Sequence, residues 1–354
     1  MTEKASRKPN YTTKSFKLYN LTLKFIENKN FLHFFENKIF SNKKFDIKDV
    51  ILIAGAPRSG TTWLMDIMMT IPDYTSLFEP TNPFWFPESL KVGFKSRTYL
   101  PVDRDWKEGE DYLRKIFTGK IVSRVPNYQL NLEVIMRRLL GHKLIIKAVR
   151  LNRMLPWITK RFEFRGVFFI IRHPCAVISS QLKTGIYGYN QPSPPFTDIC
   201  PNLDNILEEA SMIDGLESGL LNKLRKINTK EEILAAAWCL DNYVPLAYQK
   251  PHPWTMVVYE KLAKDGEKEI SRYFNEIGEK KIPPLAIKHS KRPSPLTLTD
   301  EAKNVSQASI QLSKWKKSLS EKQIERILRI VADFGLDFYS NDAEPDYDNI
   351  NIRL

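Results

Sequence analysis

The chain has 354 residues, of which 42% are hydrophobic and 27% charged, and its formal net charge is +13. This length allows one large or two small domains with a full hydrophobic core, and the composition is typical of a soluble globular enzyme. The chain contains neither a membrane-length apolar run nor the apolar core of a secretory signal, and its three cysteines (Cys175, Cys200 and Cys239) are too few for a disulfide framework, so we expect a cytoplasmic protein.

Residues 1–48 form a basic N-terminal arm that holds eleven Lys and Arg against four acidic residues. Within it, residues 15–45 have aromatic residues and lysines spaced as on the two sides of one or two amphipathic helices. We expect this arm to pack on the core, with peripheral contact to a membrane surface as the alternative. A basic chain also suits nucleic acid, but no zinc-finger, RRM or KH pattern is present, so we interpret the charge as attraction for an anionic small molecule.

From residue 50 onward, short apolar runs alternate with helical segments. Four runs predict strands of a buried parallel sheet, at 50–54, 144–148, 167–171 and 255–259, and a further short strand is expected just before residue 79. Helices are predicted at 61–70, 155–161, 176–183, within 203–224 and at 230–249. This alternation predicts a P-loop-like α/β fold, a doubly wound parallel sheet flanked by helices, whose ligands gather at the carboxyl ends of the strands.

Two stretches interrupt the alternating pattern. Residues 80–143 read as irregular and rich in aromatic, proline and basic residues, and residues 185–230 begin with a proline-rich loop. Loops of that length in a compact domain are usually lids or substrate walls, so we interpret both stretches as substrate or lid insertions. The acidic residues 341–354 are expected to form a surface tail.

The stretch VILIAGAPRSGTTWL, residues 50–64, joins an apolar strand to a helix through a turn with two glycines. The backbone N–H groups of such a turn, with the roughly half positive charge of the helix dipole, form a phosphate cradle. The spacing from Gly55 to Gly60 resembles an NTPase P-loop, but two threonines follow where that motif needs Lys and Ser or Thr. The cation comes earlier, at Arg58, so the sequence predicts a phosphate-bearing ligand held without a metal ion.

Charged residues also follow the other predicted strands, at Lys147, Arg172 and Glu260. Because the carboxyl ends of parallel strands meet at one edge of a sheet, we expect these residues and Arg58 to lie at that edge.

Four motifs, in this order, resemble those of sulfotransferases that use 3′-phosphoadenosine 5′-phosphosulfate (PAPS). APRSGTTWL, residues 56–64, resembles the family's 5′-phosphosulfate loop. IIRHPCAVISSQ, residues 170–181, resembles its 3′-phosphate motif. Residues 254–278 are similar to the family's strand, Tyr-Glu step and following helix, and residues 313–327 resemble its C-terminal Lys/Trp segment.

The resemblance implies one sulfotransferase domain over residues 49–340, with PAPS as cofactor and 3′-phosphoadenosine 5′-phosphate (PAP) as product. Arg172 and Ser180 would hold the 3′-phosphate, the guanidinium as a planar fork and the hydroxyl with one further bond. Trp63 would stack on the adenine, with a place in the core as the alternative. The cofactor-binding residues implied in this way are Arg58, Ser59, Gly60, Thr61, Thr62, Trp63, Arg172, Ser180, Tyr259, Trp315 and Lys316.

The general base cannot stand where cytosolic members of the family have it. They place a catalytic His two residues after the strand lysine, and that position here is Val149. Arg58 in place of the usual loop lysine looks more like the tyrosylprotein, carbohydrate and bacterial sulfotransferases, which place a glutamate where this chain has Glu79. The resemblance therefore implies Glu79 as base, with Arg58 and Lys147 offsetting charge on the transferring sulfuryl group.

Glu88 and Asp103 are alternative bases, whereas His173 is expected to pack or cap locally. The predicted reaction is in-line transfer to a hydroxyl or amine of a small-molecule acceptor such as a natural product. Sulfation of a carbohydrate or lipid headgroup is the alternative. A degenerate P-loop kinase, and a lipid- or nucleic-acid-binding protein that uses the basic arm, are the rival interpretations.

Overall fold

In the computed structural model of the chain, the described residues are 43–83, 86–121, 136–137, 140–184, 201–217, 219–291 and 312–353. Most of the expected N-terminal arm, and parts of both expected insertions, lie outside these ranges. Among the described residues, no helix is long and apolar enough to cross a membrane.

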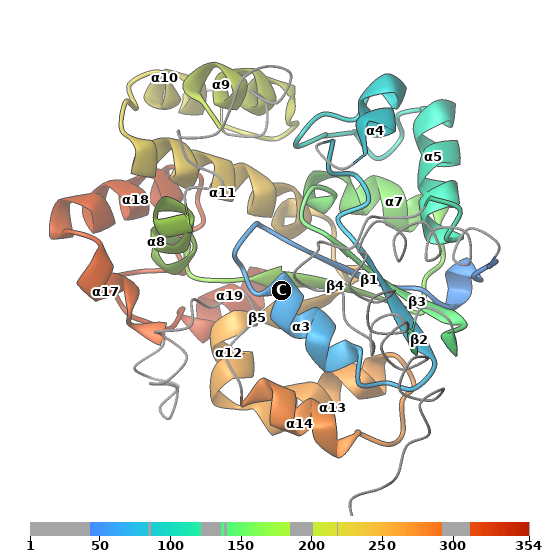
Figure 1. Cartoon of the computed structure of the whole chain (residues 1–354). Helices are drawn as coiled ribbons and strands as arrows, with labels where there is room; N and C mark the ends of the chain where they lie inside the picture. Colours follow the sequence, from blue (N-terminus) through green and yellow to red (C-terminus); the bar gives the residue numbers. More distant parts are fainter. Residues whose placement is uncertain are drawn as a thin grey trace, which may run out of the picture.

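The centre of the fold is a five-stranded parallel sheet with the strand order β2-β3-β1-β4-β5 (Figure 1). Its strands are β1 (Ile51–Gly55), β2 (Tyr74–Phe78), β3 (Lys143–Ala148), β4 (Gly166–Ile171) and β5 (Thr255–Val258). The prediction of four strands and of a short strand before residue 79 is confirmed. The strand order reverses at β1, whose neighbours are β3 and β4, and such a reversal leaves a crevice at the carboxyl ends of the strands.

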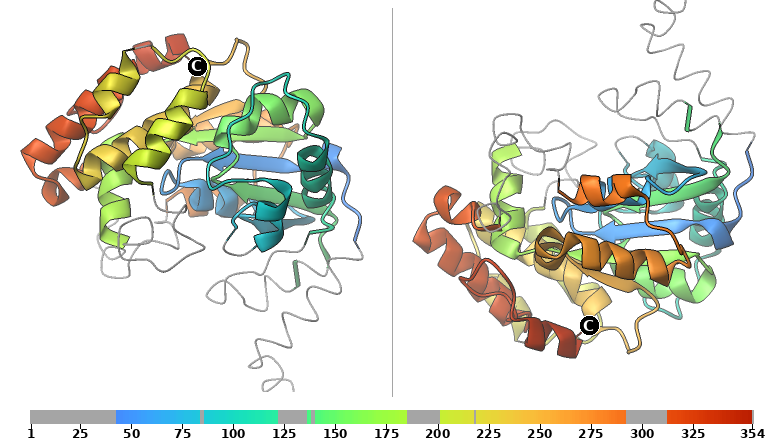
Figure 2. Two further views of the ribbon diagram at one scale, coloured as in Figure 1. Left: turned by 90° about the horizontal axis from the view of Figure 1, so that it is seen from above. Right: turned by 90° about the horizontal axis from the view of Figure 1, so that it is seen from below.

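Both faces of the sheet are buried, which explains why its strands are almost continuously apolar. Alternate side chains belong to separate cores: Leu52 of β1 lies in one hydrophobic cluster and its neighbour Ile53 in another. Helices cover both faces (Figure 2). The predicted doubly wound architecture is confirmed.

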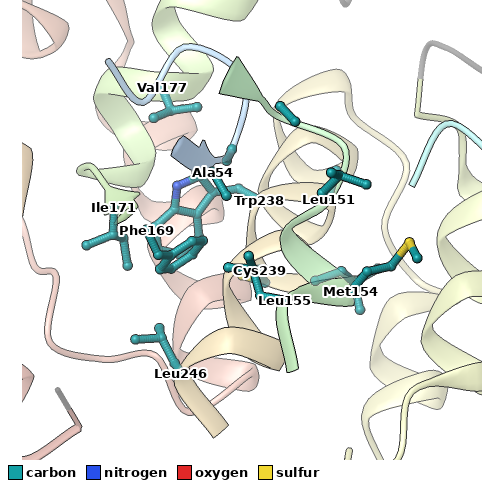
Figure 3. Close-up of a cluster of buried hydrophobic side chains, with 14 of the residues drawn as sticks. Ala54, Leu151, Met154, Leu155, Phe169, Ile171, Val177, Trp238, Cys239 and Leu246 are labelled. Carbon is teal, nitrogen blue, oxygen red and sulfur yellow. The ribbon is translucent and has the colours of Figure 1, made fainter. Parts of the chain in front are cut away.

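On one face lie α3 (Thr61–Met68), α13 (Gly266–Glu276) and α14 (Pro284–Ser290). The other face is covered by α7 (Leu155–Arg161), α8 (Pro174–Thr184), α11 (Lys230–Ala247) and α18 (Glu321–Asp333). Figure 3 shows Trp238 of α11 beside Phe169 and Ile171 of β4. Short elements complete the fold: η1 (Ile47–Asp49), η2 (Asn152–Met154), α12 (Tyr259–Lys264) and α17 (Trp315–Ser318).

The stretch 80–143 is more regular than its sequence indicated. It contains α4 (Pro87–Val92) and α5 (Lys107–Phe117), and α5 buries Tyr112, Leu113, Ile116 and Phe117 along one side. The periodicity was hidden by five charged residues on the other face of this helix. The helices predicted within 203–224 are α9 (Leu203–Met212) and α10 (Leu220–Leu224).

The C-terminal residues, expected to form a surface tail, are tied to the domain. They include α19 (Tyr347–Arg353), and Ile350 is fully buried. Glu344 pairs with Lys264 of α12 at 3.1 Å. The buried Ile350, with Tyr347 packed beside the same core, thus anchors this acidic end of the chain.

Candidate functional site

The turn between β1 and α3 is built so tightly that it requires glycine at two places. Gly60, the N-cap of α3, has a φ of 98°, and a Cβ there would lie 2.6 Å from Cδ2 of Tyr259. A Cβ on Gly55 would lie 2.5 Å from Cγ2 of Ile170. A side chain at either position would push the turn away from β4 and α12. The glycines therefore hold the start of α3, with its free N–H groups, against the end of β4.

Arg58 is the central cation of this turn. Its φ of 74° is a left-handed conformation that costs about 1 kcal/mol for a residue with a Cβ, and such strain is typical of functional sites. Its Nε donates to Oγ of Ser180 on α8 at 2.9 Å. Nη1 of Arg172, just after β4, donates to the Arg58 carbonyl at 3.1 Å. Arg58 thus brings Arg172 and Ser180 together although they lie more than 110 residues away in sequence.

Aromatic rings line the side of the turn next to β5. The Arg172 guanidinium lies 4.1 Å from the centroid of the Tyr259 ring, and the Tyr259 and Trp63 rings are 5.1 Å apart. Trp63 is only 5% exposed, and its Nε1 donates to the His289 carbonyl at 3.0 Å. The indole therefore packs in the core between α3 and α14, and its stacking on the adenine stays a prediction.

Buried polar atoms that have no partner among the described residues gather at the carboxyl edge of the sheet. Burying such an atom costs about 1–3 kcal/mol, so a cluster of them indicates that a ligand completes the hydrogen bonds. Every one of these groups can donate a hydrogen bond, which suits an anionic ligand. They are Ser59 Oγ in the turn, Thr81 Oγ1 after β2, Arg150 Nε and Asn152 Nδ2 after β3, and Arg172 Nε after β4.

A buried ion pair joins the ends of β2 and β3. Nζ of Lys147 lies 2.6 Å from Oε1 of Glu79, and their side chains are 6% and 4% exposed. The Val149 N–H donates to both carboxylate oxygens, at 3.3 and 3.2 Å, and Arg150 Nη1 lies 3.5 Å from Oε2. Burial lowers the pKa of Lys147, and the charge of Glu79 opposes that shift. The Lys147 ammonium also lies 3.9 Å from the centroid of the Phe78 ring.

A second carboxyl group, missed in the sequence, is influenced by the charge of the same lysine. Burial raises the pKa of Asp66 on α3 to about 7, while the charge of Lys147 lowers it. Its Oδ2 is buried without a partner. The available signal was a lone acidic residue in the apolar helix TTWLMDIM, one turn after Thr62.

Behind Arg172, a buried acid fixes the turn from β4 to α8. Oε1 of Glu260 accepts from the His173 N–H at 2.9 Å, and Oε2 accepts from the Tyr339 hydroxyl at 3.1 Å. Burial raises the pKa of Glu260 to about 7 and lowers the pKa of His173 to about 3. The neutral imidazole accepts from the Cys175 N–H at 3.1 Å, so His173 packs and caps locally as expected.

The remaining candidates lie farther from the turn. Trp315 is buried and stacks on His173 with a centroid distance of 4.5 Å, and Lys316 beside it is exposed. The alternative bases are both on the surface: Asp103 is 84% exposed and pairs with Lys160, and Glu88 lies in the exposed first turn of α4. Among the residues that the structure describes, no group of acidic, His and Cys side chains has the arrangement of a metal site.

No protein-family model and no curated protein matches the sequence. The structure is similar to the sulfotransferase domain of the olefin synthase of Synechococcus, with 16% identity, a TM-score of 0.42 and coverage of 84% of this chain and 97% of that one. It is also similar to a mouse sulfotransferase complexed with PAP, with 14% identity, a TM-score of 0.43 and coverage of 85% of this chain and 89% of that one. The sulfotransferase domain of the curacin biosynthetic pathway has 15% identity, a TM-score of 0.40 and coverage of 83% of this chain and 99% of that one. Similarities this low do not by themselves establish a family or a function.

Proposed function

We propose that this protein transfers a sulfuryl group from PAPS to a hydroxyl or amine of a small-molecule acceptor and releases PAP. The observation that carries the proposal is the meeting of Arg58, Arg172 and Ser180 at a glycine-lined turn. Two arginines beside a helix N-terminus suit a ligand with two separate anionic groups. The order of the four sequence motifs supports the same function, with one catalytic domain over residues 49–340.

The cofactor would be divided between the two sides of the turn. The N–H groups at the start of α3, with Ser59, Thr61 and Thr62, would hold the 5′-phosphosulfate. Arg172 and Ser180 would hold the 3′-phosphate, which ATP lacks, and the unpartnered Nε of Arg172 supports this assignment. The Tyr259 ring, already next to Arg172, would border the adenine.

PAPS would supply an activated sulfuryl group for transfer to the acceptor oxygen or nitrogen, with PAP as the leaving group. Glu79 takes the acceptor proton, held in position by the Val149 N–H. Lys147 and Arg58 offset the negative charge that develops on the sulfuryl oxygens and on the bridging oxygen. The pairing of Lys147 with Glu79 fixes both groups at the point where the ends of β2 and β3 meet the turn.

The small-molecule acceptor, a natural product in the first instance, is part of this proposal, with a carbohydrate or lipid headgroup as the alternative. Specificity would come from the two insertions. The position of Glu79 directly after β2, at the carboxyl edge of the sheet, favours it as the base over Glu88 and Asp103, which are exposed on the surface.

The test is calorimetric titration of PAP into the wild type and into Arg172→Ala. Loss of a charge-assisted contact should weaken binding by about 2–3 kcal/mol, roughly 30- to 150-fold. Arg272→Ala is the matched control, because Arg272 also covers a tyrosine ring, at 4.6 Å, but lies on α13. Its affinity for PAP should stay within twofold. Equal affinity for PAP in Arg172→Ala and the wild type would overturn the cofactor assignment.

Transfer itself is tested with radiolabelled PAPS and a mixture of hydroxylated and amine acceptors. Glu79→Gln should bind PAP as the wild type does and form no sulfated product. If it retained full transfer, the base would have to be another group, and Asp66→Asn would be examined next. Loss of transfer on adding EDTA would favour the kinase interpretation.

A further inference from the structure

Arg150, just after β3, is a buried cation that shares its acidic partner with a second buried cation. It is 8% exposed, and its ion pair within the described part of the chain is the 3.5 Å contact with Glu79. Lys147 lies much closer to that carboxylate, at 2.6 Å. The single negative charge of Glu79 is therefore shared by two buried cations, and Lys147 takes the larger part of it.

Another buried arginine of the chain has two acidic partners. Arg153, three residues later, has ion pairs with Glu209 at 2.7 Å and Asp241 at 2.9 Å. Both arginines follow β3 and both are buried, so the shortage of acidic partners is particular to Arg150. A buried guanidinium left without a full counter-charge costs several kcal/mol, and a ligand that supplies the charge removes this cost.

A second unsatisfied donor belongs to Thr81, two residues after Glu79 in the chain. The Asn82 N–H donates to the Glu79 carbonyl at 3.0 Å, which closes a turn immediately after β2. This turn carries Thr81, which is 1% exposed and whose Oγ1 has no partner. Nε of Arg150 has no partner either. Arg150, which contacts the candidate base, and Thr81, in the turn that follows it, thus both carry buried donors that no described residue uses.

These donors are separate from those assigned to the cofactor. Arg58 and Arg172 lie after β1 and β4, whereas Thr81 and Arg150 follow β2 and β3, the two strands on the opposite side of β1 from β4 in the order β2-β3-β1-β4-β5. An anion bound by Arg150 would therefore lie next to Glu79, where the acceptor must deliver its proton.

We propose that Thr81 and Arg150 form an anion subsite for the acceptor, so that the acceptor carries a carboxylate, phosphate or sulfate group close to the hydroxyl or amine that is sulfated. This inference rests on the proposed function, since it assigns the acceptor side of the same site. The guanidinium gives the anion a forked pair of donors and the threonine hydroxyl gives it a third.

The experiment uses the full chain saturated with PAP, so that added anions cannot bind in the cofactor site. Inorganic phosphate, sulfate and acetate are titrated separately, which distinguishes the three anionic groups. At least one should bind, and Arg150→Gln should weaken it tenfold or more while PAP affinity stays within twofold. Arg150→Lys, which keeps the charge but loses the fork, should restore part of the binding, and Arg272→Gln should change neither affinity.

The product spectrum gives a second measurement. With radiolabelled PAPS and matched pairs of acidic and neutral hydroxylated acceptors, the wild type should favour the acidic member, and Arg150→Gln should reduce that preference tenfold or more. If the PAP complex binds none of the anions, or if Arg150→Gln leaves both anion binding and acceptor preference unchanged, the subsite is wrong while the proposed function stands. Failure of the wild type to bind PAP would instead overturn the proposed function.

Discussion

The buried pair of Lys147 and Glu79 allows a prediction whose size follows from the structure. Removing one member of a buried pair leaves an uncompensated charge and costs about 3–5 kcal/mol of unfolding free energy. Glu79→Gln and Lys147→Met should each be destabilised by about that amount, because both side chains are at most 6% exposed. The double variant removes both of these charges and leaves Arg150 as the uncompensated buried cation, and its methionine can still pack on Phe78. It should therefore be destabilised by much less than the sum, with a coupling of about 3 kcal/mol.

The loss of unfolding free energy caused by Glu79→Gln should also depend on pH. Burial lowers the pKa of Lys147 below its usual 10.5, and loss of Glu79 removes a group that opposes this shift. Between the folded and the unfolded pKa the unfolded chain binds more protons, so stability rises with pH in that range. The destabilisation of Glu79→Gln should thus be smaller at pH 9 than at pH 7. Lys147→Met, which lacks the titrating amine, should show no such recovery.

Urea unfolding followed by tryptophan fluorescence measures these differences. The matched control is the surface pair of Lys95 and Glu208, 2.8 Å apart with side chains 63% and 58% exposed. Its double-mutant cycle should give a coupling below about 1 kcal/mol. A coupling for Lys147 and Glu79 no larger than that of the surface pair would refute the description of this ion pair as buried and mutually dependent.

Two further predictions concern the support of the turn. Gly60→Ala should lose PAP binding, because its Cβ would lie 2.6 Å from the Tyr259 ring. Gly278→Ala is the control, because Gly278 also has a positive φ, of 73°, but no atom lies within 4 Å of its Cβ. It should lose about 1 kcal/mol of unfolding free energy through backbone strain and bind PAP normally in the same titration. Because the pKa of Glu260 is raised in the folded protein, the native state holds a proton that the unfolded chain has released between pH 4.5 and about 7. The contribution of Glu260 to the unfolding free energy therefore falls as the pH rises through this range. Glu260→Gln should remove about 3 kcal/mol of that dependence, and a pH profile of urea unfolding parallel to that of the wild type would contradict this.

Most of the sheet was readable from the sequence, because its strands are buried on both faces and stand out as apolar runs. Helix α5 could not be predicted from the sequence, because its few apolar residues stand among charged residues and follow a proline-containing stretch that is typical of a loop. The buried residue Ile350, which anchors the C-terminal stretch, gave no periodic signal because acidic and polar residues surround it in the sequence.

Of the residues at the carboxyl edge of the sheet, some could be predicted from the sequence and others could not. Arg58 and Arg172 could be found because each follows an apolar strand, and Lys147 could be found because it is a charged residue near the end of one. Asp66 and Arg150 could not, because their importance comes from tertiary burial: one is a lone acid on a core helix and the other is a surface-type residue in a turn. Trp63 had two possible roles, and only the contact of its indole with His289 places it in the core.

The central claim is that the turn after β1 binds an adenosine bisphosphate without a metal ion. The most direct measurement is the affinity of the wild-type protein for PAP and for ADP, determined by calorimetry in EDTA. We expect PAP to bind at least tenfold more tightly than ADP, because Arg172 and Ser180 contact a 3′-phosphate that ADP lacks. Equal affinities, or binding of ADP that appears only with Mg²⁺, would contradict the proposed function.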